Sequence, residues 1–463
     1  GFNVYKGYDF DDNINGQLLF DDPNLSYPTA DISAVNINNN IFMAYNNNSS
    51  GDGMQYYTVL DENLNSSSYQ AINQDALLQE NAKTVLGEDG YVYYVFNDFP
   101  DYIDADILVQ KFDSNGNPAW DNPITIVSDI NTYTDEIIVD VLPMPNQGCF
   151  ISFDYRAGST KRVYAIAIDG NGDYANGWED GPKLLCDVSS KQYSESLSRT
   201  NDGYFISWRD YRDSNNSDIY AQHIGFDSEI LGQPDGFPII VLDNDQKSSI
   251  TMYSSLNNSI LSCWQDYENG SDFDINCIAT DLSNFTNSSL INLVNTEGDQ
   301  VDPQGVTTSS GKYIITWSDS RNTLSGFDIY YQILDDAYIN EVISGGESVS
   351  SASYDQTNPQ ISKYASNIDE ESFIIFWSDM RSSGKEALFN IYGQSLSIAG
   401  GGCENNADIN FDGITNILDV VQIVNYVLGN SIFNDEQICN ANVNQDDVVN
   451  ILDIITIVNS ILG

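Results

Sequence analysis

Trp208-Arg-Asp-Tyr-Arg212, followed by Asp218-Ile-Tyr-Ala-Gln222, is the stretch that decides the fold, because the chain repeats it. Close copies are WSDSR with DIYYQ at 317–332 and WSDMR with NIYGQ at 377–394. Weaker copies bring the aromatic anchors to seven, at Tyr45, Phe96, Phe153, Trp208, Trp264, Trp317 and Trp377. Successive anchors lie 51 to 60 residues apart. A period near 50 residues indicates a repeat architecture whose units pack on their neighbours.

Each repeat contains four short apolar runs separated by Gly, Asn, Asp and Ser turns. In the sixth unit we expect strands at 290–294, 304–308, 312–317 and 327–334, and the last two alternate between apolar and polar residues. Four strands per repeat predict an all-β propeller with seven blades over residues 1–398. The pattern resembles the W-x-D-x-R…D-I-Y-x-Q propellers of secreted bacterial proteins. That resemblance implies a fold and leaves the activity open.

The repeated side chains favour a scaffold role, since a single active site needs its residues only once. We expect each Trp to fill space between blades and each Asp to pair with the nearby Arg. The expected pairs are Asp210 with Arg212, Asp319 with Arg321, and Asp379 with Arg381.

Residues 1–20 predict one strand more than seven blades need. Asn3, Val4 and Tyr5 begin a segment that matches the strand and exit turn after Asp218, yet the seventh blade already has its own strand at 389–396. Two interpretations stay open. The segment closes its own ring, or it adds to the edge of a neighbouring molecule and forms a homopolymer.

The last 61 residues contain one pattern twice, NILDVVQIVNYVLG at 416–429 and NILDIITIVNSILG at 450–463. Oxygen-bearing residues at alternate positions precede each copy, and such loops suit Ca²⁺. The predicted ligands are Asp408, Asn410, Asp412, Ile414 (carbonyl), Asn416 and Asp419 in the first loop, and Asn442, Asn444, Asp446, Val448 (carbonyl), Asn450 and Asp453 in the second.

This duplication resembles the type I dockerin domain over residues 403–463, after a Gly-rich linker at 399–402. The resemblance implies a small all-α domain with two bound Ca²⁺ that docks onto a cohesin-like partner. Asn442 stands where the family has Asp, and Asp447 where it has Gly, so we expect the second site to bind Ca²⁺ more weakly.

The family uses loop positions 10 and 11 for partner recognition, and here they are apolar in both repeats: Ile417, Leu418, Ile451 and Leu452. Cellulosome dockerins have small polar pairs at these positions, so the identity of the partner stays open between a cohesin-like receptor and another copy of this chain. The four residues are either a contact surface or part of the core.

The charge of the chain limits its partners. With 68 acidic against 17 basic residues in 463, the net charge is −51, which argues against a nucleic-acid partner. No apolar run is long enough to span a bilayer. Because the chain starts at Gly1, we interpret it as an exported protein that has lost its signal peptide. A saline, Ca²⁺-rich exterior suits such an acidic protein.

An even number of cysteines in an exported chain favours disulfides. Cys263 and Cys277 are symmetric about Gly270, so a hairpin turning there would pair them. Cys403 and Cys439 each precede a calcium loop and could join the two repeats. Cys149 and Cys186 remain as a third pair, and the alternative for each pair is buried free thiols.

The sequence contains no recognisable catalytic motif. It has no Asp-box of the sialidase type, no nucleophile elbow, no phosphate-binding loop and no partner for the lone His223 in a zinc site. Paired carboxylates cannot be located by sequence among 68 acids. We therefore expect a non-catalytic structural or interaction protein outside the cell, which docks or self-assembles into a surface polymer. The alternative is a carbohydrate-binding or polysaccharide-degrading component of a dockerin–cohesin complex.

Overall fold

The computed structural model describes most of the propeller and parts of the tail. The described residues are 32–37, 40–47, 54–60, 70–72, 78–100, 104–128, 134–212, 216–267, 270–322, 326–366, 370–380, 390–399, 407–409, 415–428, 431, 433, 435–444 and 449–462.

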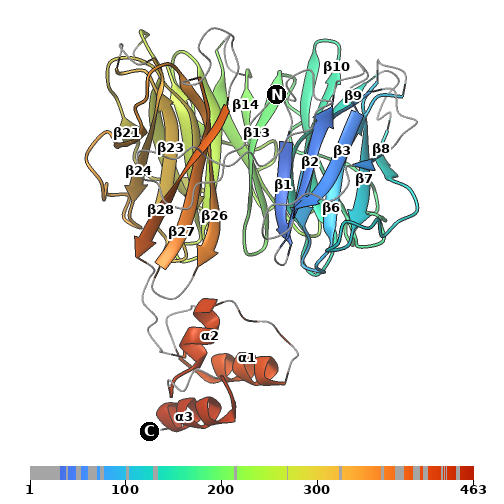
Figure 1. Ribbon diagram of the computed structural model, residues 1–463, viewed down its shortest axis with the longest axis vertical. Coiled ribbons are helices and arrows are strands. Elements are labelled where there is room, and N and C mark those ends of the chain that lie inside the picture. The colour runs from blue at the N-terminus through green and yellow to red at the C-terminus, as the bar shows by residue number, and fades with distance from the viewer. Residues whose placement is uncertain are drawn as a thin grey trace.

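These residues form seven antiparallel sheets in chain order, which makes the protein a mostly-β, seven-bladed propeller (Figure 1). The first three blades are β1 (Ile32–Ile37), β2 (Asn40–Asn47), β3 (Met54–Leu60) and β4 (Gln70–Ala71); β5 (Gln79–Leu86), β6 (Val92–Asp98), β7 (Asp106–Phe112) and β8 (Ile124–Val127); and β9 (Asp135–Pro143), β10 (Cys149–Ala157), β11 (Thr160–Ile168) and β12 (Lys183–Leu184). The next two are β13 (Gln192–Arg199), β14 (Gly203–Asp210), β15 (Asp218–Gly225) and β16 (Phe237–Ile240); and β17 (Gln246–Ser254), β18 (Ser259–Asp266), β19 (Asp274–Asp281), β20 (Thr286–Asn287) and β21 (Ile291–Val294). The last two are β22 (Gln300–Thr307), β23 (Tyr313–Asp319), β24 (Asp328–Leu334) and β25 (Glu347–Ser350); and β26 (Gln356–Ser366), β27 (Glu370–Asp379) and β28 (Asn390–Ala399).

The first strand of every blade belongs to an inner ring. From β1 through β5, β9, β13, β17 and β22 to β26, each first strand contacts the next one along the chain. Because adjacent strands are antiparallel, first strands begin at the end of the propeller where second strands finish. The seven aromatic anchors all lie on second strands, so the repeated motif marks this end, which we call the motif end.

The predicted assignment of strands to blades is offset by one strand from the observed one. The strand Ile291–Val294 pairs with β19 and completes the fifth blade, while the sixth blade ends with Glu347–Ser350. The last strand of a blade is short and partly exposed, and ESVS carries no apolar pattern that would reveal it.

The grouping also changes the account of the seventh blade. The strand Asn390–Ala399 is its third, and in the described residues this blade has three strands. Asn3, Val4 and Tyr5 lie outside the described residues, so both interpretations of the N-terminal segment stay predictions.

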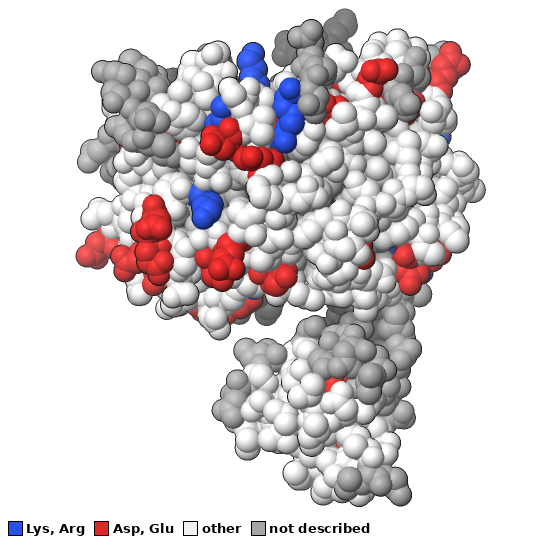
Figure 2. Space-filling view, turned by 180° about the vertical axis from the view of Figure 1, so that it is seen from behind, with Lys and Arg blue, Asp and Glu red and all other residues white. Residues whose placement is uncertain are grey.

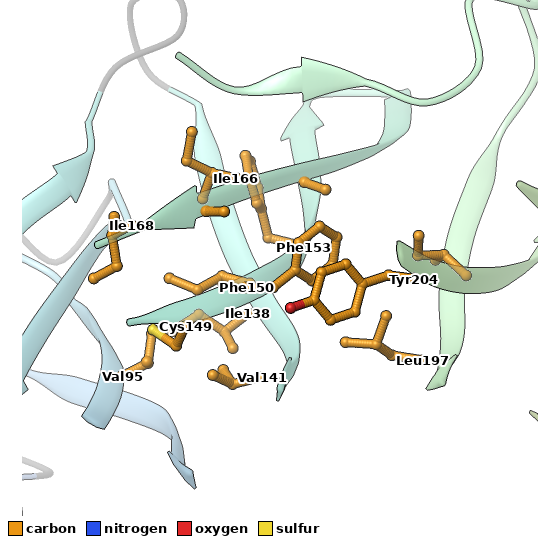
Figure 3. Packing of buried hydrophobic residues seen from close by; sticks show 14 of the residues in the cluster. Val95, Ile138, Val141, Cys149, Phe150, Phe153, Ile166, Ile168, Leu197 and Tyr204 are labelled. Carbon is orange, nitrogen blue, oxygen red and sulfur yellow. The ribbon is translucent and has the colours of Figure 1, made fainter. Parts of the chain in front are cut away.

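Large aromatic side chains fill the space between blades. Phe150 of β10 and Tyr204 of β14 stack with ring centroids 3.9 Å apart, and both are fully buried (Figure 3). The Tyr204 hydroxyl donates to the carbonyl of Pro143 at 2.7 Å, which satisfies its polar end. Such a contact joins neighbouring blades through apolar burial and one satisfied hydrogen bond.

The repeated motif forms a small network at the motif end. Trp208 and Trp317 are fully buried, as expected of residues between blades. Arg212 lies 2.7 Å from the Asp210 carboxylate, and Arg321 contacts Asp319 at 2.5 Å, so two of the expected ion pairs are confirmed. Their partly buried geometry makes them stronger than typical surface pairs. Arg381 lies outside the described residues.

One of the three expected disulfides is present in the described residues. Cys263 and Cys277 are directly opposite on β18 and β19, with Cα atoms 4.0 Å apart, and they are joined. The expectation for Cys149 and Cys186 was wrong, because both are buried free thiols. Cys149 sits within β10 between Pro143 and Ile168, whereas Cys186 follows β12 at the far side of its sheet. Cys403 and the side chain of Cys439 lie outside the described residues.

The described part of the tail contains three helices, α1 (Ile417–Val427), α2 (Asp435–Ala441) and α3 (Ile451–Leu462). They share a small apolar core that includes Ile409, Ile423, Ala441 and Ile457. In Figure 1 they lie beyond the end of the propeller at which β26 and β28 finish, opposite the motif end. None of the described helices is long and apolar enough to cross a membrane.

Candidate functional site

Every inner strand from β5 to β26 is interrupted by a β-bulge near its start, two to three residues after the first residue in five strands and four residues after it in β9. The ladder skips residues between Glu80 and Lys83, Ser194 and Ser196, Lys247 and Ile250, Val301 and Gln304, and Thr357 and Gln360, with an equivalent break in β9. Left-handed backbone occurs at Asn81, Ser248, Asp302 and Asn358. Bulges redirect side chains and are frequent beside active sites, so this ring is the natural place to search for chemistry.

Side chains of one blade hold the bulge of the next. Asp154 Oδ1 accepts from the backbone N–H of Ser194 at 2.9 Å, and Gln265 Oε1 accepts from that of Asp302 at 2.9 Å. The bulges are therefore fixed by hydrogen bonds between blades, which gives rigid positions to the side chains they carry.

Glu195 is a carboxylate of this ring that hydrogen bonds from the next blade hold in place. It accepts hydrogen bonds from the backbone N–H groups of Ser248 at 2.9 Å and Ser249 at 2.7 Å, both in the bulge of the next blade. Arg209 Nε lies 3.5 Å from Glu195 Oε1. Burial raises the pKa of Glu195, and the two amides and Arg209 act in the opposite direction.

Two tyrosines lie beside Glu195. The Arg209 guanidinium lies over the Tyr193 ring at 5.2 Å, and Tyr193 meets Tyr211 edge to face with centroids 6.2 Å apart. Both tyrosines are partly exposed. Flat, partly exposed rings next to an ion pair can contact a ligand that is both apolar and hydroxylated.

Asp302 is the second carboxylate in this region, in the left-handed bulge of β22. Burial raises its pKa, and the charge of Lys247 opposes the shift. Lys247 immediately precedes Ser248, so Glu195 and Asp302 flank the bulge of the fifth blade from either side. Two carboxylates with raised pKa on β13 and β22, the inner strands on either side of β17, are the equipment that general acid–base chemistry requires.

Sequence reasoning missed both carboxylates, although a signal was present. A fully buried Gln opens five of the inner strands, namely Gln79, Gln192, Gln246, Gln300 and Gln356. In the last four strands its Nε2 donates to carbonyls of the preceding loop. Because each bulge follows this Gln closely, the recurring Gln marks the segments that contain Glu195 and Asp302, although it does not show which of their side chains the bulge carries.

The tail supplies a second candidate site at its loop–helix junctions. Asp419 is fully buried, and its two carboxylate oxygens accept from the backbone N–H groups of Ile409 at 2.8 Å and Asn416 at 2.9 Å. Asp453 is equally buried and accepts from Asn444 at 3.2 Å and Asn450 at 2.8 Å. In both repeats the last predicted ligand is therefore a buried Asp whose carboxylate accepts two backbone hydrogen bonds.

The remaining predicted ligands are partly described. Asp408 is buried, and Asn416 and Asn450 cap α1 and α3 by accepting from Leu418 and Leu452 at 2.8 Å. Asn442 is also described, whereas Asn410, Asp412, Ile414, Asp446 and Val448 lie outside the described residues. Among the residues that the structure describes, no group of three His, Cys, Asp or Glu side chains is placed to hold a metal ion.

The charge of the tail nevertheless suits a cation. Residues 403–463 contain nine acidic residues and no Lys, Arg or His. The buried carboxylates of Asp419 and Asp453 therefore have no basic side chain of their own segment to balance them. Oxygen donors of this kind with uncompensated negative charge fit Ca²⁺.

The four apolar residues at loop positions 10 and 11 are exposed. Ile417, Leu418, Ile451 and Leu452 expose 62, 58, 58 and 54% of their surface, and they lie in the first turns of α1 and α3. Val421 and Ile455, one turn later, are about half exposed. The interpretation of these pairs as core is therefore wrong, and we call the six exposed apolar residues, three from each repeat, the tail patch.

Comparison with known proteins gives structural neighbours only. No known family pattern and no curated protein matches the sequence. A polysaccharide lyase described as an ulvan lyase is 9% identical, covers 80% of this chain and 91% of its own, and has a TM-score of 0.45. An α-L-arabinofuranosidase from Fusarium graminearum is 11% identical over 80% of this chain and 93% of its own, with a TM-score of 0.41. An α-L-arabinanase from Penicillium chrysogenum is 9% identical over 69 and 93%, with a TM-score of 0.39.

These neighbours correct two expectations. All three are named as carbohydrate-active enzymes, which runs against the expectation of a non-catalytic, self-assembling structural protein and the expectation that the chain is not an enzyme. At 9 to 11% identity the likeness extends to the fold alone, and any catalytic role depends on the residues of this chain.

Proposed function

We propose that the chain is a polysaccharide-degrading component of an extracellular complex. The propeller binds and hydrolyses the polysaccharide, and the tail attaches it to a protein receptor. The observation that carries the catalytic part is the pair Glu195 and Asp302, two carboxylates with raised pKa that flank one rigid bulge.

The proposed chemistry divides the work between the two carboxylates. Asp302, which is partly exposed, donates its proton to the oxygen of the glycosidic bond as that bond breaks. Glu195, held by two backbone amides and Arg209, accepts a proton from the water that attacks the sugar carbon. Tyr193 and Tyr211 provide the surface on which sugar rings lie.

The test is a hydrolysis screen on a panel of neutral and acidic polysaccharides, with release of reducing ends as the readout. We expect Glu195→Gln and Asp302→Asn each to lower the rate at least 100-fold while polysaccharide binding persists. Asp281→Asn is the matched control, because Asp281 is a partly exposed carboxylate at the end of β19 in the fifth blade, where it accepts from Ser283. Full activity in both site variants would reject the assignment.

For the tail we propose a dockerin-like module over residues 403–463, joined by a linker at 399–402 to a propeller domain at 1–398. Asp408, Asp419, Asn442 and Asp453, with the neighbouring loop oxygens, would hold two Ca²⁺. The uncompensated acids of this segment support metal binding, and bound Ca²⁺ would supply the missing positive charge.

The tail patch supports a docking role. An exposed apolar surface that both repeats contribute to equally fits a receptor with an apolar face, and a cohesin-like domain is the partner we propose. Immobilised cohesin domains should retain the full chain in Ca²⁺ and release it in EDTA. Leu418→Ser combined with Leu452→Ser should abolish retention, whereas Ile461→Ser, an exposed residue at the end of α3, should not.

We also propose that the chain acts outside the cell. The Cys263–Cys277 disulfide supports this location, because such bonds form and persist in oxidising compartments. Fractionation of the producing cells should recover the protein from the medium or the cell surface, and recovery only from the cytosol would contradict the proposal.

A further inference from the structure

The basic residues of this acidic chain are unevenly distributed. Eight of its 17 Lys and Arg residues lie between Cys149 and Arg212, in the third and fourth blades. Figure 2 shows basic side chains gathered toward the upper part of the propeller, while acidic side chains lie mainly along its lower edge. A local concentration of positive charge in a protein of net charge −51 calls for a physical reason.

Three of these residues form what we call the basic rim cluster: Arg156, Lys161 and Lys191. Arg156 and Lys161 are directly opposite each other on β10 and β11. Two like charges in directly opposite positions destabilise a strand pair. Burial lowers the pKa of Lys161, and the charges of Arg156 and Lys191 lower it further. The three cations are therefore close enough to repel one another.

The acids around the cluster compensate it only in part. Asp135 is opposite Arg156 on β9, and Asp154 lies 3.5 Å from Arg156. The same Asp154 carboxylate also accepts from the backbone of Ser194. The buried Nε–H of Arg156 has no acceptor among the described residues. The cluster therefore has three cations, two carboxylates and this one buried N–H group without an acceptor in the part of the chain that the structure describes. An anionic oxygen from a ligand would satisfy both the excess positive charge and this donor.

The cluster adjoins the proposed catalytic carboxylates. Asp154 connects Arg156 to Ser194, and Ser194 directly precedes Glu195. Lys191 directly precedes β13 and lies four residues before Glu195, a separation of at most about 13 Å along the chain. A ligand bound at the basic rim cluster could therefore extend to Glu195 as one short oligosaccharide.

We propose that the basic rim cluster is a subsite for an acidic sugar, which binds its carboxylate or sulfate oxygens through Arg156, Lys161 and Lys191. The inference rests on the proposed function and specifies its substrate class as an anionic polysaccharide. The guanidinium of Arg156 suits either anion because its planar fork donates two parallel hydrogen bonds.

The test measures binding of the full chain to three polymers by affinity electrophoresis: polygalacturonate, dextran sulfate and neutral dextran. We expect the wild type to bind one or both acidic polymers, and Lys161→Met and Lys191→Met to weaken that binding at least tenfold. Lys312→Met is the matched control, since Lys312 pairs with Glu341 in the sixth blade at 2.8 Å, and its binding should equal that of the wild type.

The choice of polymers distinguishes a carboxylate ligand from a sulfate ligand. Binding to polygalacturonate alone assigns the carboxylate, and binding to dextran sulfate alone assigns the sulfate. Equal binding of acidic polymer by the wild type and both cluster variants would overturn the inference, as would binding to dextran alone, and both results leave the proposed function intact. Glu195→Gln should bind the acidic polymer normally and fail only in hydrolysis, which distinguishes failure of the subsite from failure of the catalytic pair.

Discussion

The indole Nε1 of Trp208 donates a hydrogen bond of 2.9 Å to Oδ2 of Asp210, two residues later on the same strand. The same bond occurs in three further blades, from Trp264, Trp317 and Trp377 to Asp266, Asp319 and Asp379. Because Asp also binds the following Arg in two of these blades, one carboxylate fixes both the buried ring and the turn that follows it. This relationship explains why the motif recurs with unchanged spacing.

Loss of this carboxylate should destabilise the propeller. Asp319→Ala leaves the buried Trp317 indole without its acceptor and Arg321 without its partner. We expect the free energy of unfolding to fall by about 3 kcal/mol, in the range for breaking a buried pair. Urea titration of the full chain measures the change. Asp281→Ala, which removes a partly exposed carboxylate at the end of β19, should cost far less, and equal losses would contradict this account.

The glycines beneath the tryptophans should resist substitution. Gly236 has φ +76°, and an added Cβ would lie 2.4 Å from Cη2 of Trp208. Gly236→Ala therefore combines backbone strain with overpacking, and we expect a loss of about 3 kcal/mol.

Gly90→Ala is the matched control for the glycine prediction. Gly90 has the same φ of +76° with nothing within 4 Å of the added Cβ, so only the strain of about 1 kcal/mol remains. Thermal unfolding of both variants provides the comparison, and equal shifts in Tm would show that contact with Trp208 is unimportant.

Sequence periodicity was sufficient to predict the number of blades, because each anchor marks a buried second strand. It could not assign the outermost strands, since segments such as Glu347–Ser350 are short, partly exposed and without apolar pattern. It did not locate Glu195 or Asp302 either, because a bulge is a relationship between two strands that one strand does not reveal. The exposure of Ile417 and Leu418 likewise required the packing of α1, whose buried face is formed by Asp419, Val420 and Ile423.

Glu195 should make stability depend on pH in a defined direction. Its folded pKa is raised by burial, so between about 4.3, the unfolded value, and the folded value the native state retains a proton that the unfolded chain releases. Stability therefore falls as pH rises through this window. Glu195→Gln should reduce the fall, as measured by urea titration from pH 4 to 8 against the wild type.

The control for the pH prediction has the opposite sign. Hydrogen bonds from Ser283 lower the pKa of Asp281, so its contribution is present above the unfolded pKa and is lost as pH decreases. Asp281→Asn should leave the decline at higher pH unchanged. A Glu195→Gln profile parallel to that of the wild type would show that Glu195 is ionised equally in both states.

Calcium should stabilise the tail without affecting the propeller. In the full chain we expect hydrogen exchange of backbone amides in α1 and α3 to slow at least tenfold when Ca²⁺ replaces EDTA, while exchange in β14 and β18 stays constant. Asp419→Asn should remove more of the protection than Asp453→Asn, because the second loop has Asn442 at its first position. Protection that is identical in Ca²⁺ and EDTA would argue against metal binding.

The most direct test of the central claim is the release of reducing ends from a panel of polysaccharides by the full chain and by the double variant Glu195→Gln/Asp302→Asn. The account predicts release from at least one acidic polysaccharide by the wild type, and binding without release by the double variant. Release by both proteins at the same rate, or neither binding nor release of any polysaccharide by the wild type, would contradict it.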